Sequence, residues 1–321
     1  MTPPPNRRVS GPAFRWFAYA TFLSMIVIVL TGAAVRLTGS GLGCPDWPTC
    51  FKGRVTGSMR IHSFIEYTNR GVTGALIAIV GITLIAAYLR EQRRRDLIWL
   101  SAALVLGVVG DALLGGLVVY SKLNPYLVSL HLLLSLAMVA IGALLYHHSK
   151  YEYGPGARAD LRDPYFRNLA RLLWIPFLLV VLTGMGTTGS GPHAGSSQGQ
   201  LVARRLPWAF SSAAWVHSLC AIFFIGIVLG LLLAIWKSGA PNALKLGVRR
   251  LVYVALLQAA IGAVQYLTHV PAWLVELHEL GAISLTIGVT QFNVRQYARD
   301  RVPGVAKKSA RAPVPTLEVV H

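Results

Sequence analysis

Eight apolar segments, each long enough to cross a lipid bilayer, dominate this sequence. A hydrocarbon core of about 30 Å needs about 20 apolar residues in one helix. The segments that meet this length are residues 16–35, 62–89, 97–119, 128–147, 169–187, 213–236, 247–267 and 272–294. The chain is 54% hydrophobic and only 13% charged, a balance typical of membrane proteins rather than soluble domains. We therefore predict an all-α polytopic membrane protein with eight transmembrane helices.

The basic residues are distributed unevenly between the two sets of loops. A net charge of +18 would suggest a nucleic-acid partner if the protein were soluble. With both termini on one side, that side holds 22 of the 30 Lys and Arg residues, an excess that marks the cytoplasmic face. We therefore predict a multi-pass protein of the cell membrane (the inner or plasma membrane) with both termini cytoplasmic. The basic tails then face the lipid bilayer, and no nucleic acid is expected as a partner.

The two halves of the chain resemble each other. VLTGAAVRLTGSG at 29–41 recurs as VLTGMGTTGSG at 181–191, and GLVVYSKLNPYLVSLH at 116–131 recurs as GAVQYLTHVPAWLVELH at 262–278. Each half has four spans, so both halves enter the membrane from the same side, and the repeat is parallel. We expect two pseudo-symmetric four-helix bundles, which would suit a duplicated site. The predicted organisation is an N-terminal arm (1–15), a first half (16–150), a cytoplasmic linker (151–168), a second half (169–297) and a disordered tail (298–321).

Single histidines begin alternate predicted helices at their outer ends. His131, His217 and His278 lie at similar depths, whereas His62 starts its helix higher and Asn69 occupies the matching depth. One intramembrane histidine is usually a hydrogen-bonded packing residue. A set that recurs across a repeat instead favours imidazoles that bind heme iron from two helices. A zinc site is less favoured because the sequence has no HExxH motif and no CxxC pair.

Two cysteines lie close together in the first predicted outer loop. Cys44 and Cys50 are six residues apart, and thiols outside the cytoplasmic membrane are commonly oxidised. A small disulfide-closed ring is the favoured interpretation, and two free thiols are the alternative.

Glu66 is a carboxylate inside a predicted span, which is costly unless it is paired, protonated or beside a polar cavity. One interpretation is structural: Arg70 follows four residues later, and the pair simply neutralises both charges. The other interpretation is functional: Glu66 handles protons or stabilises charge beside a cofactor. In that case Arg36 or Arg70 is available to pair with a heme propionate.

These residues together resemble a known family. GAAVRLTGSGLGCPDWPTC at 32–50, IEYTNR at 65–70 and the single histidines that begin the fourth, sixth and eighth spans look like heme A synthase. The resemblance extends over nearly the whole chain, from about Arg15 to Arg299. The GLGCPDWP loop combined with IEYxxR is its most specific part.

The resemblance implies an oxidoreductase that converts heme O to heme A, the prosthetic group of cytochrome c oxidase, by successive hydroxylations of a ring methyl to a formyl group. It implies a heme b in the second half, bound by His217 and His278. It places the substrate heme in the first half, with His131 and His62 as candidate iron ligands. It also implies Glu66 as the catalytic residue and a paired Cys44 and Cys50. The expected partners are heme O synthase as the source of substrate, a membrane electron donor and the assembly of cytochrome c oxidase.

One departure leaves the second ligand of the substrate heme open. Many family members carry E-x-x-H in the second helix, whereas this chain has Asn69 at the histidine position and His62 one heptad earlier. Two other functions are weighed against the synthase. A bis-histidine diheme electron carrier explains the histidines but leaves Glu66 and the GLGCPDWP loop without a role. A transporter fits the repeat but lacks evident broken helices at mid-membrane.

Overall fold

A computed structural model of the chain describes residues 8–51, 60–150, 160–161, 164–196, 203–240, 242–295 and 297–298. Its elements are α1 (Gly11–Leu37), α2 (Ile61–Tyr88), α3 (Arg95–Tyr120), α4 (Pro125–Ser149), β1 (Asp160–Leu161), α5 (Pro164–Leu172), α6 (Trp174–Ser190), α7 (Phe210–Lys237), α8 (Asn242–Leu267), α9 (Ala272–Arg295) and β2 (Tyr297–Ala298). Eight segments are long and apolar enough to cross a membrane. The predicted all-α membrane fold is confirmed.

The fifth span is interrupted near its N-terminal end. A single segment, Tyr165–Ser190, qualifies as the span, but it divides into α5 and α6 at Leu173. Pro176 lies in the first turn of α6. Proline has no backbone N–H to donate and its ring crowds the preceding turn, so a continuous helix is disfavoured there.

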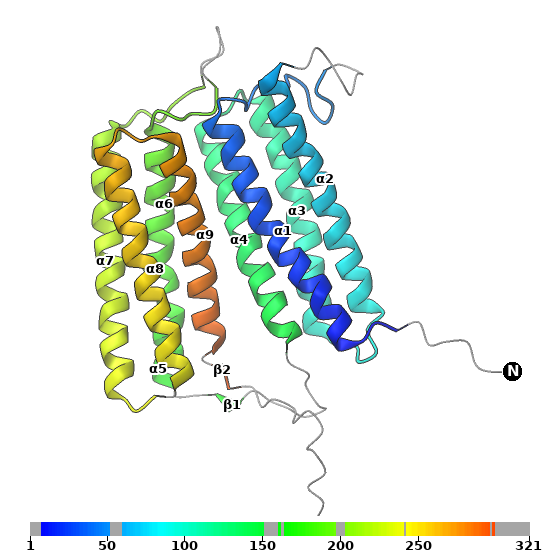
Figure 1. Cartoon of the computed structure of the whole chain (residues 1–321), viewed down its shortest axis with the longest axis vertical. Helices are drawn as coiled ribbons and strands as arrows, with labels where there is room; N and C mark the ends of the chain where they lie inside the picture. Colours follow the sequence, from blue (N-terminus) through cyan, green and yellow to red (C-terminus); the bar gives the residue numbers. More distant parts are fainter. Residues whose placement is uncertain are drawn as a thin grey trace, which may run out of the picture.

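The eight spans form two bundles that share an interface (Figure 1). In the first bundle α1 packs against α2 and α4, and α3 packs between α2 and α4. In the second bundle α7 packs between α6 and α8, and α8 packs against α9, whereas α6 and α9 are in much less contact than α1 and α4. Between the bundles α9 contacts α4 and α1, while α4 also contacts α6. The two halves therefore meet around the α4–α9 pair.

Small residues allow close helix contacts inside each bundle. A Cβ atom placed on Gly107 of α3 would lie 2.0 Å from the Met138 sulfur of α4, so the Met138 side chain occupies the space that the glycine leaves. In lipid, packing of this kind drives helix association because the tails outside are as apolar as the side chains inside. Large side chains such as Leu106 remain 75% exposed, consistent with a lipid-facing surface.

The loops lie in two groups, one at each end of the bundles. The connections after α1, α3, α6 and α8 lie at one end, where Gly41 N–H donates to Gly195 O at 2.9 Å and joins the two repeats. The N-terminal end of α1 and the β1–β2 pair lie at the other end (Figure 1). Helix α1 begins at Gly11, inside the predicted arm. Most of the predicted linker and nearly all of the predicted tail lie outside the described residues.

Candidate functional site

The first bundle encloses a cavity of about 410 Å³. Its walls are mostly apolar, and its polar lining includes Arg36, Glu66, Asn69, Asp111 and His131. The second half contributes to the same cavity, chiefly through Met185, Thr188, His193, Arg204 and Glu279. An apolar cavity with a few convergent polar groups is the usual form of a small-molecule or cofactor site.

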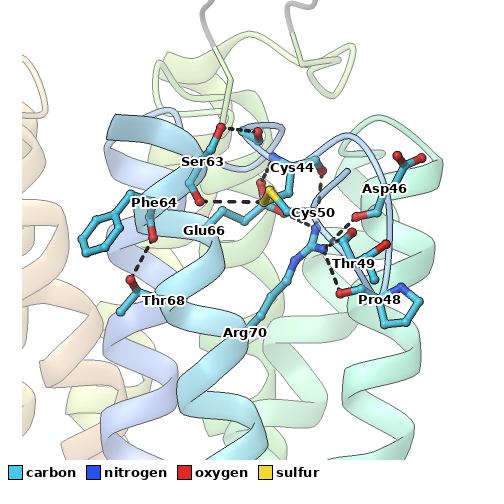
Figure 2. Close-up of a disulfide and its surroundings, with 11 residues drawn as sticks. Cys44, Asp46, Pro48, Thr49, Cys50, Ser63, Phe64, Glu66, Thr68 and Arg70 are labelled. Atoms are coloured by element: carbon cyan, nitrogen blue, oxygen red, sulfur yellow. Dashed lines mark hydrogen bonds and ion pairs between the residues drawn. A yellow bond between two sulfur atoms is a disulfide. The ribbon is translucent and has the colours of Figure 1, made fainter. Parts of the chain in front are cut away.

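Glu66 lies on the wall of this cavity and is bonded to the loop between α1 and α2 (Figure 2). Its Oε2 accepts from the Cys44 N–H at 2.7 Å, and its Oε1 accepts from Arg70 Nη2 at 2.6 Å. The side chain is only 7% accessible. The i, i+4 ion pair of the structural interpretation is thus present, and it holds the carboxylate in a fixed position beside the cavity.

Arg70 is occupied by the same loop. Its Nη1 donates to the carbonyl oxygens of Asp46 at 2.7 Å and Thr49 at 3.0 Å, besides the ion pair with Glu66 (Figure 2). A guanidinium has five N–H donors and no acceptor, so these contacts use most of its capacity. Within the described part of the chain, Arg36 Nη1 donates one hydrogen bond, to the His193 carbonyl at 3.1 Å, and Arg36 also lines the cavity. Of the two predicted propionate partners, Arg36 is the better placed.

The predicted Cys44–Cys50 disulfide is present, with an S–S distance of 1.99 Å. Both cysteines are buried beneath the loop. The third cysteine, Cys220, is free and lies in α7. The loop closed by this disulfide therefore contacts both Glu66 and Arg70 through hydrogen bonds.

His62 and Asn69 occupy different environments. His62 Nδ1 is hydrogen-bonded to Ser40 Oγ at 2.9 Å, and His62 is not among the residues that line the cavity. Asn69 does line it, and its buried Oδ1 has no hydrogen-bond partner in the part of the chain that the structure describes. The structure thus brings Asn69, rather than His62, to the site with Glu66 and His131.

His131 has a carboxylate neighbour that the sequence analysis missed. Its Nδ1 lies 2.7 Å from Oδ1 of Asp111 in α3. Ser135 Oγ donates to the other oxygen of Asp111 at 2.6 Å. The signal was available in the sequence, since Asp111 is a lone charge inside an apolar span, and such charges are commonly functional.

His217 and His278 face each other in the second bundle. Their ring centroids are 6.2 Å apart and their planes are 81° from parallel. At this spacing a nitrogen from each ring can bind one metal atom, because metal–nitrogen bonds are about 2 Å long. Thr183 Oγ1 is hydrogen-bonded to His217 Nδ1 at 3.2 Å. The predicted pair is therefore brought together across α7 and α9.

Glycines face both histidines of the second bundle. A Cβ on Gly184 would lie 3.0 Å from the His217 ring, and one on Gly262 would lie 2.9 Å from the His278 ring. A larger residue at either position would crowd the imidazole ring. Among the described residues no three or more of His, Cys, Asp and Glu are grouped as metal ligands. A metal between His217 and His278 would thus need further ligands from a non-protein group, and a porphyrin supplies four nitrogens.

The sequence analysis also missed two acidic residues in the last span. Glu276 and Glu279 lie in α9, and Glu279 reaches the cavity of the first bundle, where Arg36 lies. The wall that the two halves share is therefore charged. The visible signal was again a carboxylate within an apolar span.

Comparison with known proteins agrees with this architecture. The model of a family described as cytochrome oxidase assembly protein matches residues 15–60 and 55–289. The heme A synthase of Staphylococcus saprophyticus is 25% identical over 298 residues, which cover 87% of this chain and 93% of that protein. The heme A synthase of Staphylococcus haemolyticus is 27% identical over 286 residues, covering 83% and 89%. That of Geobacillus kaustophilus is 32% identical over 120 residues, covering 36% and 37%.

Proposed function

The chain belongs to the family of cytochrome oxidase assembly proteins, and from that membership we propose that it is a membrane oxidoreductase that converts heme O to heme A. Proteins named heme A synthase match it over nearly their whole length. The observation that carries the proposal is the cavity of the first bundle, which places a fixed carboxylate, Glu66, and an imidazole, His131, on the walls of one apolar chamber. Heme A so formed serves the assembly of cytochrome c oxidase.

The first bundle is the proposed site of the substrate, heme O. His131 is the proposed iron ligand because its side chain is 39% accessible and lines the cavity. Arg36 is the proposed partner of a propionate. The apolar walls suit the farnesyl tail of heme O, which avoids water inside the membrane. His62, bonded to Ser40, is assigned to holding the outer loop, and Asn69 would lie beside the bound substrate because it lines the cavity.

The second bundle is the proposed site of a resident heme b. His217 and His278 would hold its iron, because their ring centroids are 6.2 Å apart. Heme b supplies one-electron transfer when bound. The chain's own contribution is to fix both imidazoles and to hold this site next to the substrate cavity across the α4–α9 interface.

Glu66 is the proposed catalytic residue. Arg70 and the Cys44 N–H hold the Glu66 carboxylate in place beforehand, so it can stabilise partial positive charge at the reacting methyl carbon in a transition state without reorganising. The ion pair therefore serves the catalytic role rather than competing with it. Hydroxylation of an unactivated methyl otherwise lies beyond side-chain chemistry.

The diheme electron carrier is the alternative function, and it is less favoured. It uses the histidines equally well but gives no task to the carboxylate at the cavity wall, and the matching relatives are heme A synthases. We further propose that the protein lies in the cell membrane with both termini cytoplasmic. A heme O synthase would supply the substrate and a membrane electron donor the electrons.

The function is tested by extracting hemes from a host that makes heme O, with and without this chain, and separating them by chromatography. Heme A should appear only when the chain is present. If heme O stays unchanged while the purified protein carries heme b, the electron carrier is the correct function. If the protein carries no heme at all, both functions are excluded.

Replacing Gly262 by Ala should weaken binding of the resident heme. The new methyl group would lie 2.9 Å from the His278 ring, a contact that displaces the imidazole from its position. We expect a lower heme b content per purified chain, measured from the absorption spectrum. Gly226→Ala is the matched control, because a Cβ there meets nothing within 4 Å and alanine favours the helix. Equal heme content in both variants would show that the close packing of glycine and histidine does not position the ligand.

A further inference from the structure

The two bundles place chemically different residues beside equivalent histidines. In each bundle the histidine of the last helix faces a glycine of the helix before it: His131 faces Gly115, and His278 faces Gly262. Four residues before that glycine, one helical turn away, the first bundle has Asp111 and the second has Gln258. The repeat thus provides an internal comparison between a carboxylate and an amide at one position.

In the second bundle the amide is hydrogen-bonded to the histidine's backbone, and no hydrogen bond joins it to the ring among the described residues. Gln258 Nε2 donates to the His278 backbone carbonyl at 2.8 Å. Four residues after the histidine, this bundle has Ala282, which carries no hydroxyl. His278 Nδ1 has no hydrogen-bond partner within the described residues. The ring of His278 is therefore positioned without an anionic neighbour at this point.

In the first bundle the carboxylate lies against the ring. Asp111 Oδ1 is 2.7 Å from His131 Nδ1, although the contact is not aligned as a hydrogen bond. The corresponding residue four positions after the histidine is Ser135, whose hydroxyl donates to Asp111 Oδ2 at 2.6 Å. The Asp111 side chain is 14% accessible and the His131 side chain 39%. One carboxylate oxygen is therefore held by Ser135, while the other is turned to the imidazole.

A carboxylate at Nδ1 has two effects on an imidazole that binds a metal. It fixes the tautomer, because the proton resides on Nδ1 and Nε2 is left as the electron-pair donor. It also makes the ring more basic, which strengthens the bond to the metal. Asp111 Oδ1 lies within hydrogen-bond distance of His131 Nδ1, and a metal bound at Nε2 would restrict how the ring can turn relative to that oxygen.

We propose that Asp111 is a positioning residue for His131: it holds the Nδ1 proton, turns Nε2 into the cavity and strengthens electron donation to the iron of the substrate heme. Ser135 positions Asp111 in turn. The inference rests on the proposed function in one respect, that His131 binds the substrate iron. It adds that the two histidine sites are electronically unequal. The site of the first bundle stabilises ferric iron more, because hydrogen bonds to the ligands set the reduction potential of a heme.

The test compares Asp111→Asn with the parent chain, both purified with hemes from a host that makes heme O. Asparagine keeps the shape of the side chain and removes its charge. Heme O affinity should fall about 10- to 100-fold, the usual effect of losing the outer partner of a metal ligand. In a redox titration followed by absorption, the substrate-heme component should shift to a higher potential. The resident-heme component should stay in place as an internal reference.

Two further variants keep the result decisive. Ser135→Ala, which copies Ala282 of the second bundle, should shift the same component in the same direction by less. Asp111→Glu should restore part of the affinity, because it keeps a carboxylate. Unchanged affinity and potential in both Asp111→Asn and Ser135→Ala would overturn the positioning role while leaving the synthase function intact. A parent chain that binds no heme O would instead overturn the proposed function and this inference together.

Discussion

Replacement of Glu66 by Gln should reduce the formation of heme A by at least about 100-fold, the loss typical of removing one fixed electrostatic stabiliser from an active site. In the parent chain the Cys44 N–H donates a hydrogen bond to Glu66 at 2.7 Å. The glutamine oxygen can accept the same hydrogen bond, so the contact with the loop persists while the negative charge is lost. The measurement is the ratio of heme A to heme O in membranes of a host that makes heme O. A 100-fold loss corresponds to about 2.7 kcal/mol of transition-state stabilisation.

Controls separate this catalytic role from the structural one. Thr68→Ala lies on the same helix and changes an exposed side chain that bonds only to the Phe64 carbonyl (Figure 2), so heme A should form normally. The Glu66→Gln protein should accumulate in the membrane and keep its resident heme. Full activity of Glu66→Gln would refute the catalytic role. If the Glu66→Gln protein instead fails to accumulate in the membrane, and a variant lacking Arg70 fails in the same way, the role of Glu66 is structural, as one half of an ion pair.

Replacing either His217 or His278 by Ala should remove the resident heme b from the purified protein. The two rings are 6.2 Å apart on different helices, so each supplies one side of the iron and neither can take over from the other. Heme b content and the low-spin absorption spectrum of the purified chain measure the effect. His131→Ala should give the opposite pattern, in which heme b is retained and heme O is no longer bound.

His269→Asn is the control for this series. His269 lies in the loop between α8 and α9 at a backbone φ of 64°, a conformation that asparagine tolerates well, and its side chain is exposed. Its heme content should equal that of the parent chain. If His131→Ala lost heme b while His217→Ala kept it, the assignment of the two hemes to the two bundles would be reversed.

The features that could be predicted from the sequence are local or depend on segment length. The eight spans were predicted from apolar segments long enough to cross a bilayer. The repeat was predicted from sequence segments that recur in the second half, such as VLTG. The Cys44–Cys50 bond and the contact of Glu66 with Arg70 join residues six and four positions apart. Over such short separations the chain itself brings the partners together. Family membership was visible for the same reason, since its motifs are contiguous.

What only the tertiary structure decided is which side of each helix faces the site. It placed Asn69 on the cavity wall and His62 against Ser40, and it committed Arg70 to loop carbonyls. It also joined Asp111 to His131 across two helices and brought Glu279 of the second half into the cavity of the first. In a soluble protein, apolar periodicity would reveal the inward face of a helix. In a membrane the lipid side is as apolar as the packed side, so the rotation of each helix is set by contacts with its neighbours.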